Sequence, residues 1–209
     1  MQLIKKYFPD LSQDQYRALE KLGGLYSYWN RRINVISRKD IQHLYLHHVL
    51  HSLVISRISL FKNGRVILDA GTGGGFPGIP LAILSPDKEF TLLDSVRKKI
   101  IVVDAVCSEL GLKNTSAVCA RLEDHRDKYH TIISRAVTGF PRFVGWVAKN
   151  LGEDAEGIVS LKGGELETEL SGFKNRVRIL PVSDFFSEDY FRTKKIICLP
   201  AASIAEGES

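Results

Sequence analysis

The segment Asp69-Ala-Gly-Thr-Gly-Gly-Gly-Phe-Pro-Gly78 is the strongest indication of the fold of this chain. It closes a short apolar run, 65–69, that is typical of a buried strand, and it precedes an apolar stretch, 79–84, that is typical of a helix. Glycines between a strand and a helix let the backbone approach a ligand closely, and the helix N-terminus favours negative charge. The segment therefore predicts a ligand-binding loop at the carboxyl end of a first strand.

Strand and helix patterns alternate after this loop. Helices are expected at 96–110, ended by Gly111, and at about 140–151. This alternation is typical of the α/β class with a doubly wound parallel sheet, which binds its ligand at the carboxyl ends of the strands. The further predicted strands are 90–94, 115–119, 131–134, 158–161, 177–180 and 195–199.

The first third of the chain has a helical pattern. Ser12-Gln-Asp-Gln15 predicts a capping box, after which apolar residues recur every three or four positions as far as Ile33. The pair Gly23-Gly24 is expected to weaken or break this helix. Asp40 is expected to cap a second helix that runs to about Phe61.

These patterns divide the chain into a helical extension, 1–63, a ligand-binding domain, 64–200, and a loose tail, 201–209. The extension holds ten Lys/Arg and four Asp/Glu, whereas the rest of the chain holds nineteen and twenty. A one-sided basic region is typical of a protein that binds a polyanion such as RNA, although a solvated basic helix surface has the same composition. Within the extension, Arg31 and Arg32 are expected to attract phosphates.

Three histidines of the extension, His43, His47 and His51, lie four positions apart, on one face of the second predicted helix. Such spacing can bind zinc, but no cysteine or acidic ligand accompanies them. We therefore expect no metal site and interpret the three as a polar or RNA-facing helix surface.

Composition excludes several classes of protein. No apolar run reaches the roughly 18 residues that a membrane span needs, and no stretch resembles a signal peptide. The three cysteines, Cys107, Cys119 and Cys198, are far apart and odd in number, which argues against a disulfide framework and a cysteine zinc site. A cytoplasmic protein with reduced thiols is expected.

Two classes of cofactor fit the glycine loop. The G-x-G-x-x-G spacing of residues 73–78, with Asp94 about twenty residues further on, satisfies the dinucleotide fingerprint, so a nicotinamide-dependent reductase stays open. However, a carboxylate at Asp69 suits a cationic cofactor such as S-adenosylmethionine (SAM). Pro77 also removes a backbone donor from the turn that would bind a pyrophosphate. Both observations favour SAM.

Longer motifs are more specific than the glycines. They are Trp29-Asn30, Ile33-Asn34, His48-x-x-His51-Ser52-Leu53, Gly75-Phe-Pro-Gly-Ile-Pro80, Leu92-Leu-Asp94-Ser95, Lys98-Lys99, Arg121-Leu-Glu123-Asp124, Ser134-Arg135-Ala136 and Leu161-Lys162-Gly163. In these motifs, over most of its length, the chain resembles the bacterial small-subunit ribosomal RNA guanine-N7 methyltransferases, also called glucose-inhibited division protein B.

The resemblance implies a class I, Rossmann-like SAM-dependent methyltransferase with a seven-stranded sheet, its last strand antiparallel, and an N-terminal helical extension. It implies methyl transfer to N7 of a guanine in 16S ribosomal RNA, guanine 527 of the decoding-region loop, in the free RNA or the small subunit. A monomer is expected. A non-catalytic ribosome-binding factor is the alternative that the intact glycine loop disfavours.

The spacing and the resemblance together place the cofactor and RNA contacts. By resemblance, Phe76 packs against the cofactor, while Leu122 and Glu123 bracket its adenine. The expected cofactor contacts are Asp69, Gly71, Gly73, Gly75, Phe76, Asp94, Leu122, Glu123 and Arg135. The expected RNA contacts are Lys98, Arg121, Arg135, Arg31 and Arg32.

Methylation of guanine N7 needs no proton transfer to the protein, because N7 carries a lone pair and no proton. No general base is therefore needed, and the chain offers no dedicated one. Arg135 is expected to position the substrate by donating to guanine O6 or to a phosphate, leaving N7 free. The sequence departs from the family at His51, where an aspartate is common, and the family's C-terminal arginine corresponds either to Arg192 or to Lys194.

Overall fold

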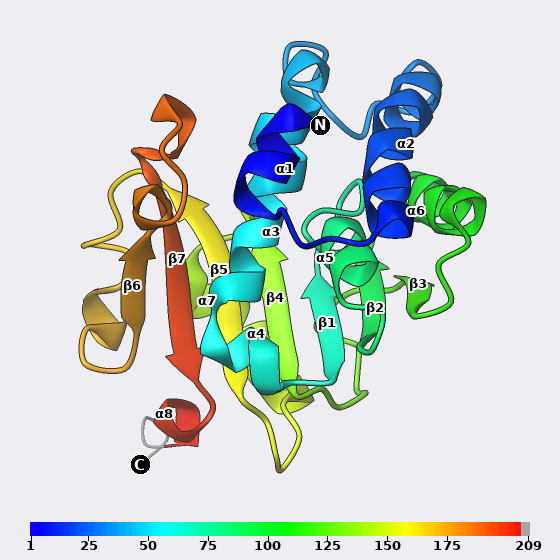
Figure 1. Cartoon of the computed structure of the whole chain (residues 1–209). Helices are drawn as coiled ribbons and strands as arrows, with labels where there is room; N and C mark the ends of the chain where they lie inside the picture. The colour runs from blue at the N-terminus through cyan, green and yellow to red at the C-terminus, as the bar shows by residue number, and fades with distance from the viewer. Residues whose placement is uncertain (206–209) are drawn as a thin grey trace.

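Seven strands form one sheet in the computed structural model, which describes residues 1–205 (Figure 1). They are β1 (Val66–Ala70), β2 (Glu89–Asp94), β3 (Thr115–Cys119), β4 (Thr131–Arg135), β5 (Gly157–Gly163), β6 (Arg178–Pro181) and β7 (Lys194–Pro200). The order is β3-β2-β1-β4-β5-β7-β6; β1 to β5 pair in parallel, and β7 is antiparallel to β5 and β6. The predicted strands and the antiparallel last strand are confirmed, to within two residues at each end.

Helices cover both faces of the sheet. Because strand side chains alternate, Ile67 of β1 joins the core on one face and Leu68 joins the core on the other. The α-helices are α1 (Gln2–Tyr7), α2 (Gln13–Asn30), α3 (His51–Leu53), α4 (Ser59–Asn63), α5 (Gly78–Leu84), α6 (Arg97–Leu110), α7 (Phe140–Val147) and α8 (Ala202–Ala205). Among the helices of residues 1–205, none is long and apolar enough to cross a membrane.

The first face is covered by the N-terminal helices together with α5 and α6, and the second by α7 and the segment after β5. Short 3-10 turns complete the second face and the C-terminal region. They are η4 (Ala148–Asn150), η5 (Ser171–Phe173), η6 (Val182–Asp184) and η7 (Asp189–Phe191). Gly111 ends α6 in the left-handed region with φ 66°, as its position in the sequence predicts.

The sheet has its switch point at β1, which pairs with β2 on one side and with β4 on the other. The chain moves outward through β2 and β3 and then returns to add β4 beside β1. Ligands of doubly wound sheets bind at the carboxyl ends of such strands. In Figure 1 these ends point to the top of the sheet, where the loop after β1 and the C-terminal end of α2 also lie.

The helical extension shares its core with the sheet. Tyr26 of α2 and Leu53 of α3 are fully buried in the same cluster as the strand residues of the first face. The predicted capping box is confirmed, since Ser12 Oγ accepts from the Gln15 backbone N–H at 3.2 Å and Gln15 Oε1 accepts from the Ser12 N–H at 2.9 Å.

The glycine pair does not break α2, which runs unbroken from Gln13 to Asn30. A Cβ at Gly23 would lie 3.0 Å from the hydroxyl oxygen of Tyr45, which donates a hydrogen bond to the Glu20 carbonyl at 2.8 Å. Glycine at this position therefore lets the next segment of the extension pack closely on α2, and this contact compensates for the low helix propensity.

The prediction of a second α-helix in the extension is wrong in the type of helix. In place of one α-helix, η1 (Ile41–His43) and η3 (Val54–Arg57) are 3-10 turns, and η2 (Leu44–Leu50) is π-helical. Asp40 makes no cap, because its carboxylate binds side chains of η2 instead. Apolar spacing does not separate an α-helix from a wider turn, and single π-helical turns are common at functional sites.

The expected loose tail is ordered in the part that the structure describes. Ala202–Ala205 forms α8, and Arg176 Nε donates to the Ser203 carbonyl at 2.7 Å. The remaining residues of the predicted tail, 206–209, lie outside the described residues.

If the extension and the sheet share one core, Leu53→Ala will lower the free energy of unfolding by about 2–5 kcal/mol, because the cavity cannot fully collapse. Urea denaturation followed by fluorescence and by circular dichroism should give one coincident, shifted transition. Ile101→Ala, at an exposed position of α6, is the control and should change stability by about 0.5 kcal/mol or less. A separate early transition of the extension would contradict the shared core.

Candidate functional site

The buried carboxylate of Asp69 holds the glycine loop against the sheet. Its Oδ2 accepts hydrogen bonds from Thr72 Oγ1 at 2.5 Å and from the Gly78 backbone N–H at 2.8 Å. A Cβ at Gly78 would lie 2.6 Å from this same oxygen, so only glycine fits there. One carboxylate thus sets the path of the loop from the end of β1 to the start of α5.

Asp69 does not line the cavity beside the loop, although the sequence predicts it as a cofactor contact. Its side chain is fully buried, and Oδ1 has no hydrogen-bond partner within residues 1–205. Burial raises the pKa of Asp69 to about 7, against the opposing hydrogen bonds from Thr72 and Gly78. Its charge therefore does not by itself distinguish SAM from a dinucleotide.

Asp94 ends β2 and is fixed by backbone and side-chain donors. Its Oδ2 accepts from the Gly73 N–H at 3.0 Å and from Lys99 Nζ at 3.4 Å, and its Oδ1 accepts from the Val96 N–H at 2.9 Å. A carboxylate oxygen can accept more than one hydrogen bond. Three of the roughly four acceptor sites of Asp94 are in use, so one stays free for a ribose hydroxyl, and the long contact with Lys99 can give way to a second hydroxyl.

A first cavity, the cofactor hollow, lies between the glycine loop and the ends of β2, β3 and β4. Its walls include Trp146 of α7 and Arg121, which was expected at the RNA. The glycines present bare backbone to it, and a Cβ at Gly71 would clash with Val137 at 2.7 Å. The residues expected at the cofactor that line this hollow are Gly71, Gly73, Asp94, Leu122, Glu123 and Arg135.

Gly75 and Phe76 belong to the glycine loop but are buried and do not line the cofactor hollow. The Phe76 ring is 2% exposed and packs against Tyr26 at 4.9 Å and His48 at 5.1 Å between ring centres. The guanidinium of Arg135 lies 5.4 Å from the centre of the same ring. Phe76 therefore packs against the side chain of Arg135, and its predicted contact with the cofactor stays a prediction.

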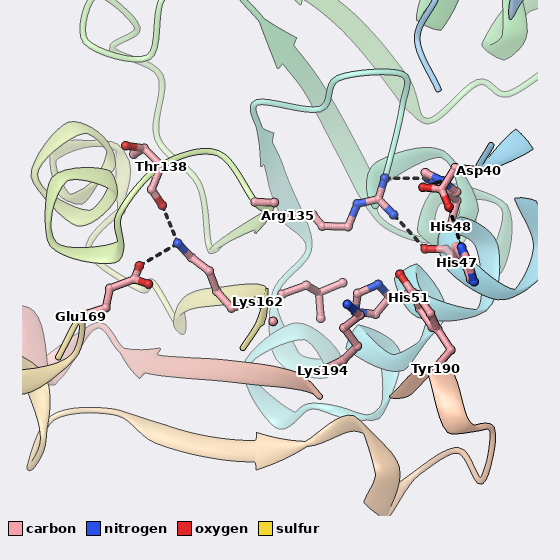
Figure 2. A pocket seen from close by; sticks show the side chains of 13 residues that line it. Asp40, His47, His48, His51, Arg135, Thr138, Lys162, Glu169, Tyr190 and Lys194 are labelled. Atoms are coloured by element: carbon pink, nitrogen blue, oxygen red, sulfur yellow. Dashed lines mark hydrogen bonds and ion pairs between the residues drawn. The ribbon is translucent and has the colours of Figure 1, made fainter. Parts of the chain in front are cut away.

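A second hollow opens beside the first and is shown in Figure 2. Arg135 and Ala136, at the end of β4, line both hollows. Ala136 is the one non-glycine residue of 1–205 with a positive φ, 50°, and such strain is common at functional sites. The other residues that line the second hollow are Asp40, His47, His48, His51, Thr138, Leu161, Lys162, Gly163, Glu169, Tyr190 and Lys194.

Arg135 is held by the π-helical turn of the extension. It donates to His48 Nδ1 at 2.8 Å and to the His47 carbonyl at 3.2 Å. Because His48 Nδ1 accepts, its Nε2 carries the proton and donates to Asp40 Oδ2 at 3.2 Å; His47 Nδ1 contacts Asp40 Oδ1 at 2.6 Å. Burial, followed by the charge of Arg135, lowers the pKa of His48 to about 4, so His48 is neutral at physiological pH.

Several residues of the second hollow have no role predicted from their sequence motifs alone. Lys162 and Glu169 form an ion pair at 2.7 Å, and Tyr190 stacks on His47 with ring centres 3.9 Å apart. The motif Leu161-Lys162-Gly163, at the end of a predicted strand, was a usable signal for Lys162. Nothing in the sequence marks Glu169 or Tyr190, because their place depends on long-range packing.

The C-terminal basic residue that faces the second hollow is Lys194, whose Nζ lies 4.8 Å from the Tyr190 ring centre. Arg192 instead pairs with Asp189 at 2.9 Å on the surface. His51 is buried, with neither ring nitrogen hydrogen-bonded in residues 1–205, which corrects its expected place on an RNA-facing surface. Burial lowers its pKa well below the ordinary value.

The remaining basic residues expected at the RNA are exposed and line neither hollow. Lys98 lies in the first turn of α6. Arg31 and Arg32 follow the C-terminal end of α2, and the Arg32 guanidinium stacks 3.7 Å from the centre of the half-exposed Tyr28 ring. No group of three or more His, Cys, Asp or Glu side chains within residues 1–205 is arranged to hold a metal ion.

Residues 15–195 match the family model of rRNA small subunit methyltransferase G. The chain belongs to this family. A protein of Christiangramia forsetii named ribosomal RNA small subunit methyltransferase G is 50% identical over 205 residues, 96% of this chain and 97% of its own. One of the same name from Cytophaga hutchinsonii is 48% identical over 96% of this chain and all of its own. The predicted family and enzyme class are confirmed.

Solved structures agree with the methyltransferase fold of the methyltransferase G family. A magnesium protoporphyrin IX methyltransferase from Synechocystis with bound SAM has a TM-score of 0.57 at 17% identity, covering 91% of this chain and 99% of that one. A SAM-dependent methyltransferase from Aquifex aeolicus has a TM-score of 0.56 at 15% identity, covering 75% and 93%. The predicted class I, Rossmann-like fold is confirmed.

The depressed pKa of His48 makes stability depend on pH. The folded-state pKa lies below the unfolded value of about 6.5, so the unfolded chain binds more protons between these values and stability rises with pH from about 4 to 6.5. His48→Gln keeps an acceptor for Arg135 without titrating, and should flatten this rise by a few kcal/mol. Urea denaturation at several pH values measures the slope; equal slopes for both proteins would contradict the assignment.

Proposed function

We propose that the chain transfers a methyl group from SAM to N7 of a guanine in 16S ribosomal RNA, guanine 527 by resemblance, and acts as a monomer. One observation carries the proposal. The cofactor hollow and the second hollow adjoin at Arg135 and Ala136, at the switch point of the sheet. The first has the features of a nucleoside site, and the second offers donors and acceptors for a base.

The cofactor hollow fits SAM. When bound, SAM supplies a methyl group on a positively charged sulfonium. Asp94 accepts the ribose hydroxyls, Gly71 and Gly73 let the backbone approach, and Leu122 and Glu123 flank the adenine. Arg135 stands at the junction with the second hollow, where it positions the substrate.

The second hollow receives the target guanine after it leaves its stack. Bound SAM would supply its methyl carbon to the N7 lone pair, the electron pair of the carbon–sulfur bond would stay on sulfur, and the positive charge would pass to the guanine. No proton moves, so the neutral, hydrogen-bonded His48 has no role as a base. The protein contributes orientation and exclusion of water.

Radiolabel from methyl-labelled SAM tests the reaction on small subunits from a strain that lacks the enzyme. Borohydride and aniline then cut the RNA at N7-methylguanosine. Label with one new cleavage site is expected. Label without cleavage would show that an atom other than N7 is methylated. Absence of label on both subunits and naked RNA would overturn the proposed activity.

Asp94→Asn should raise the KM for SAM roughly tenfold or more, because an amide offers one acceptor where the carboxylate offers two. The KM for the RNA should stay unchanged, since Asp94 does not line the second hollow. Steady-state kinetics with each substrate varied in turn provides the measurement. An equal loss toward both substrates would argue that Asp94 only supports the fold.

The basic end of α2 should contribute long-range attraction to the RNA. The double variant Arg31→Gln, Arg32→Gln should reduce the slope of log K against log salt concentration by about one to two, because each lost phosphate contact removes nearly one counterion. Filter binding between low and physiological salt measures the slope. An unchanged slope would place these arginines away from the RNA.

A further inference from the structure

The second hollow carries one charged pair that neither the fold nor the reaction explains fully. Lys162 extends from the carboxyl end of β5, and Glu169 lies on the segment that follows it. Their side chains are 12% and 26% exposed, and Nζ lies 2.7 Å from Oε1. Figure 2 shows this pair on one side of the hollow, with Arg135 and His48 toward the other side.

The pair leaves free hydrogen-bonding capacity. Lys162 Nζ donates to Glu169 Oε1 and to the Thr138 carbonyl, so one of its three N–H groups is unused. Glu169 Oε1 also accepts from the Phe140 backbone N–H, at the start of α7. Oε2 has no hydrogen-bond partner among residues 1–205. The pair therefore presents one donor beside one acceptor oxygen.

This pattern complements the Watson–Crick edge of guanine, which places the acceptor O6 beside the donors N1–H and N2–H. Enzymes that act on a flipped base recognise it through this edge. Adenine reverses the order, with a donor at N6 and an acceptor at N1. It would set its amino group against the ammonium of Lys162 and its lone pair against the carboxylate of Glu169. Buried mismatches of this kind exclude a wrong base strongly.

We propose that Lys162 and Glu169 select guanine by binding its Watson–Crick edge, with Lys162 donating to O6 and Glu169 Oε2 accepting from N1–H and N2–H. The inference rests on the proposed function. It leaves N7 unbound and free for the methyl group. It also leaves Arg135 for a phosphate or the cofactor.

The carboxylate has a second effect on the reaction. Methyl transfer places a positive charge on the guanine, which makes N1–H and N2–H stronger donors. A hydrogen bond to Glu169 is then stronger in the transition state than in the ground state, and such an interaction raises kcat. The lowered pKa of Glu169, held down by the hydrogen bonds from Lys162 and Phe140, keeps it ionised at physiological pH.

Inosine at the target position tests the pair directly, because it keeps O6, N1–H and N7 but lacks the N2 amino group. Small subunits reconstituted with guanosine or inosine at that position are methylated by the wild-type protein and by Glu169→Gln. The amide still accepts from Phe140, so the start of α7 is retained. Glu156→Gln is the matched control, since Glu156 precedes β5, at the end of the strand opposite to Lys162, and accepts a hydrogen bond from Asn63 at 3.3 Å.

The wild-type protein should prefer guanosine over inosine by roughly tenfold or more in kcat/KM, as loss of a hydrogen bond to a charged group predicts. Glu169→Gln should lose roughly 10- to 100-fold on guanosine, mainly in kcat, and its preference should fall toward one. Its affinity for SAM should match that of the wild type, and Glu156→Gln should behave as the wild type throughout.

If Glu169→Gln lost activity equally on guanosine and inosine and retained the preference for guanosine, Glu169 would have only a structural role. That result would overturn the inference. Equal activity of the wild-type protein on the two substrates would also overturn it. Failure of the proposed function is distinguishable, because the wild-type protein would then give no N7 cleavage on the guanosine substrate, and the inference would fall with it.

Discussion

The path of the glycine loop depends on one buried carboxylate. Asp69 accepts from Thr72 and Gly78, and these bonds fold the chain back on itself at the end of β1. The same fold brings the Gly73 N–H within 3.0 Å of Asp94, so the loop and the carboxylate at the end of β2 position each other. These hydrogen bonds hold the loop at the wall of the cofactor hollow and at the start of α5. Full burial of the Asp69 carboxylate raises its pKa to about 7, so the arrangement costs the free energy of holding this group away from water.

The helical extension completes the site. Arg135 ends a strand of the sheet, but the groups that orient it, His47 and His48, come from the π-helical turn of the extension. Asp40 in turn binds both histidines. The second hollow therefore forms where the extension packs on the sheet. Its shape depends on the core that the extension and the sheet share. In the proposed function, the positively charged extension attracts the RNA and also shapes the hollow that receives the base.

The sequence predicted the sheet well and the site unevenly. Strand boundaries followed from alternating apolar runs, and Asp94 and the loop glycines followed from their spacing to the first strand. Asp69 was expected to face the cofactor, but a carboxylate at a strand end can turn inward to satisfy backbone donors, and spacing does not reveal its direction. The π-helical turn was missed because its apolar period resembles that of an α-helix. Glu169 and Tyr190 reach the second hollow through packing between distant segments, which no local pattern encodes.

In the proposed function, the cofactor and the base occupy two hollows that meet at Arg135 and Ala136. A crystal structure with bound S-adenosylhomocysteine would show this arrangement. We expect the ribose hydroxyls to bind Asp94, the adenine to lie against Leu122, and the sulfur to point across Ala136 into the second hollow. A ribose away from Asp94, or a sulfur directed away from the second hollow, would overturn the proposed arrangement.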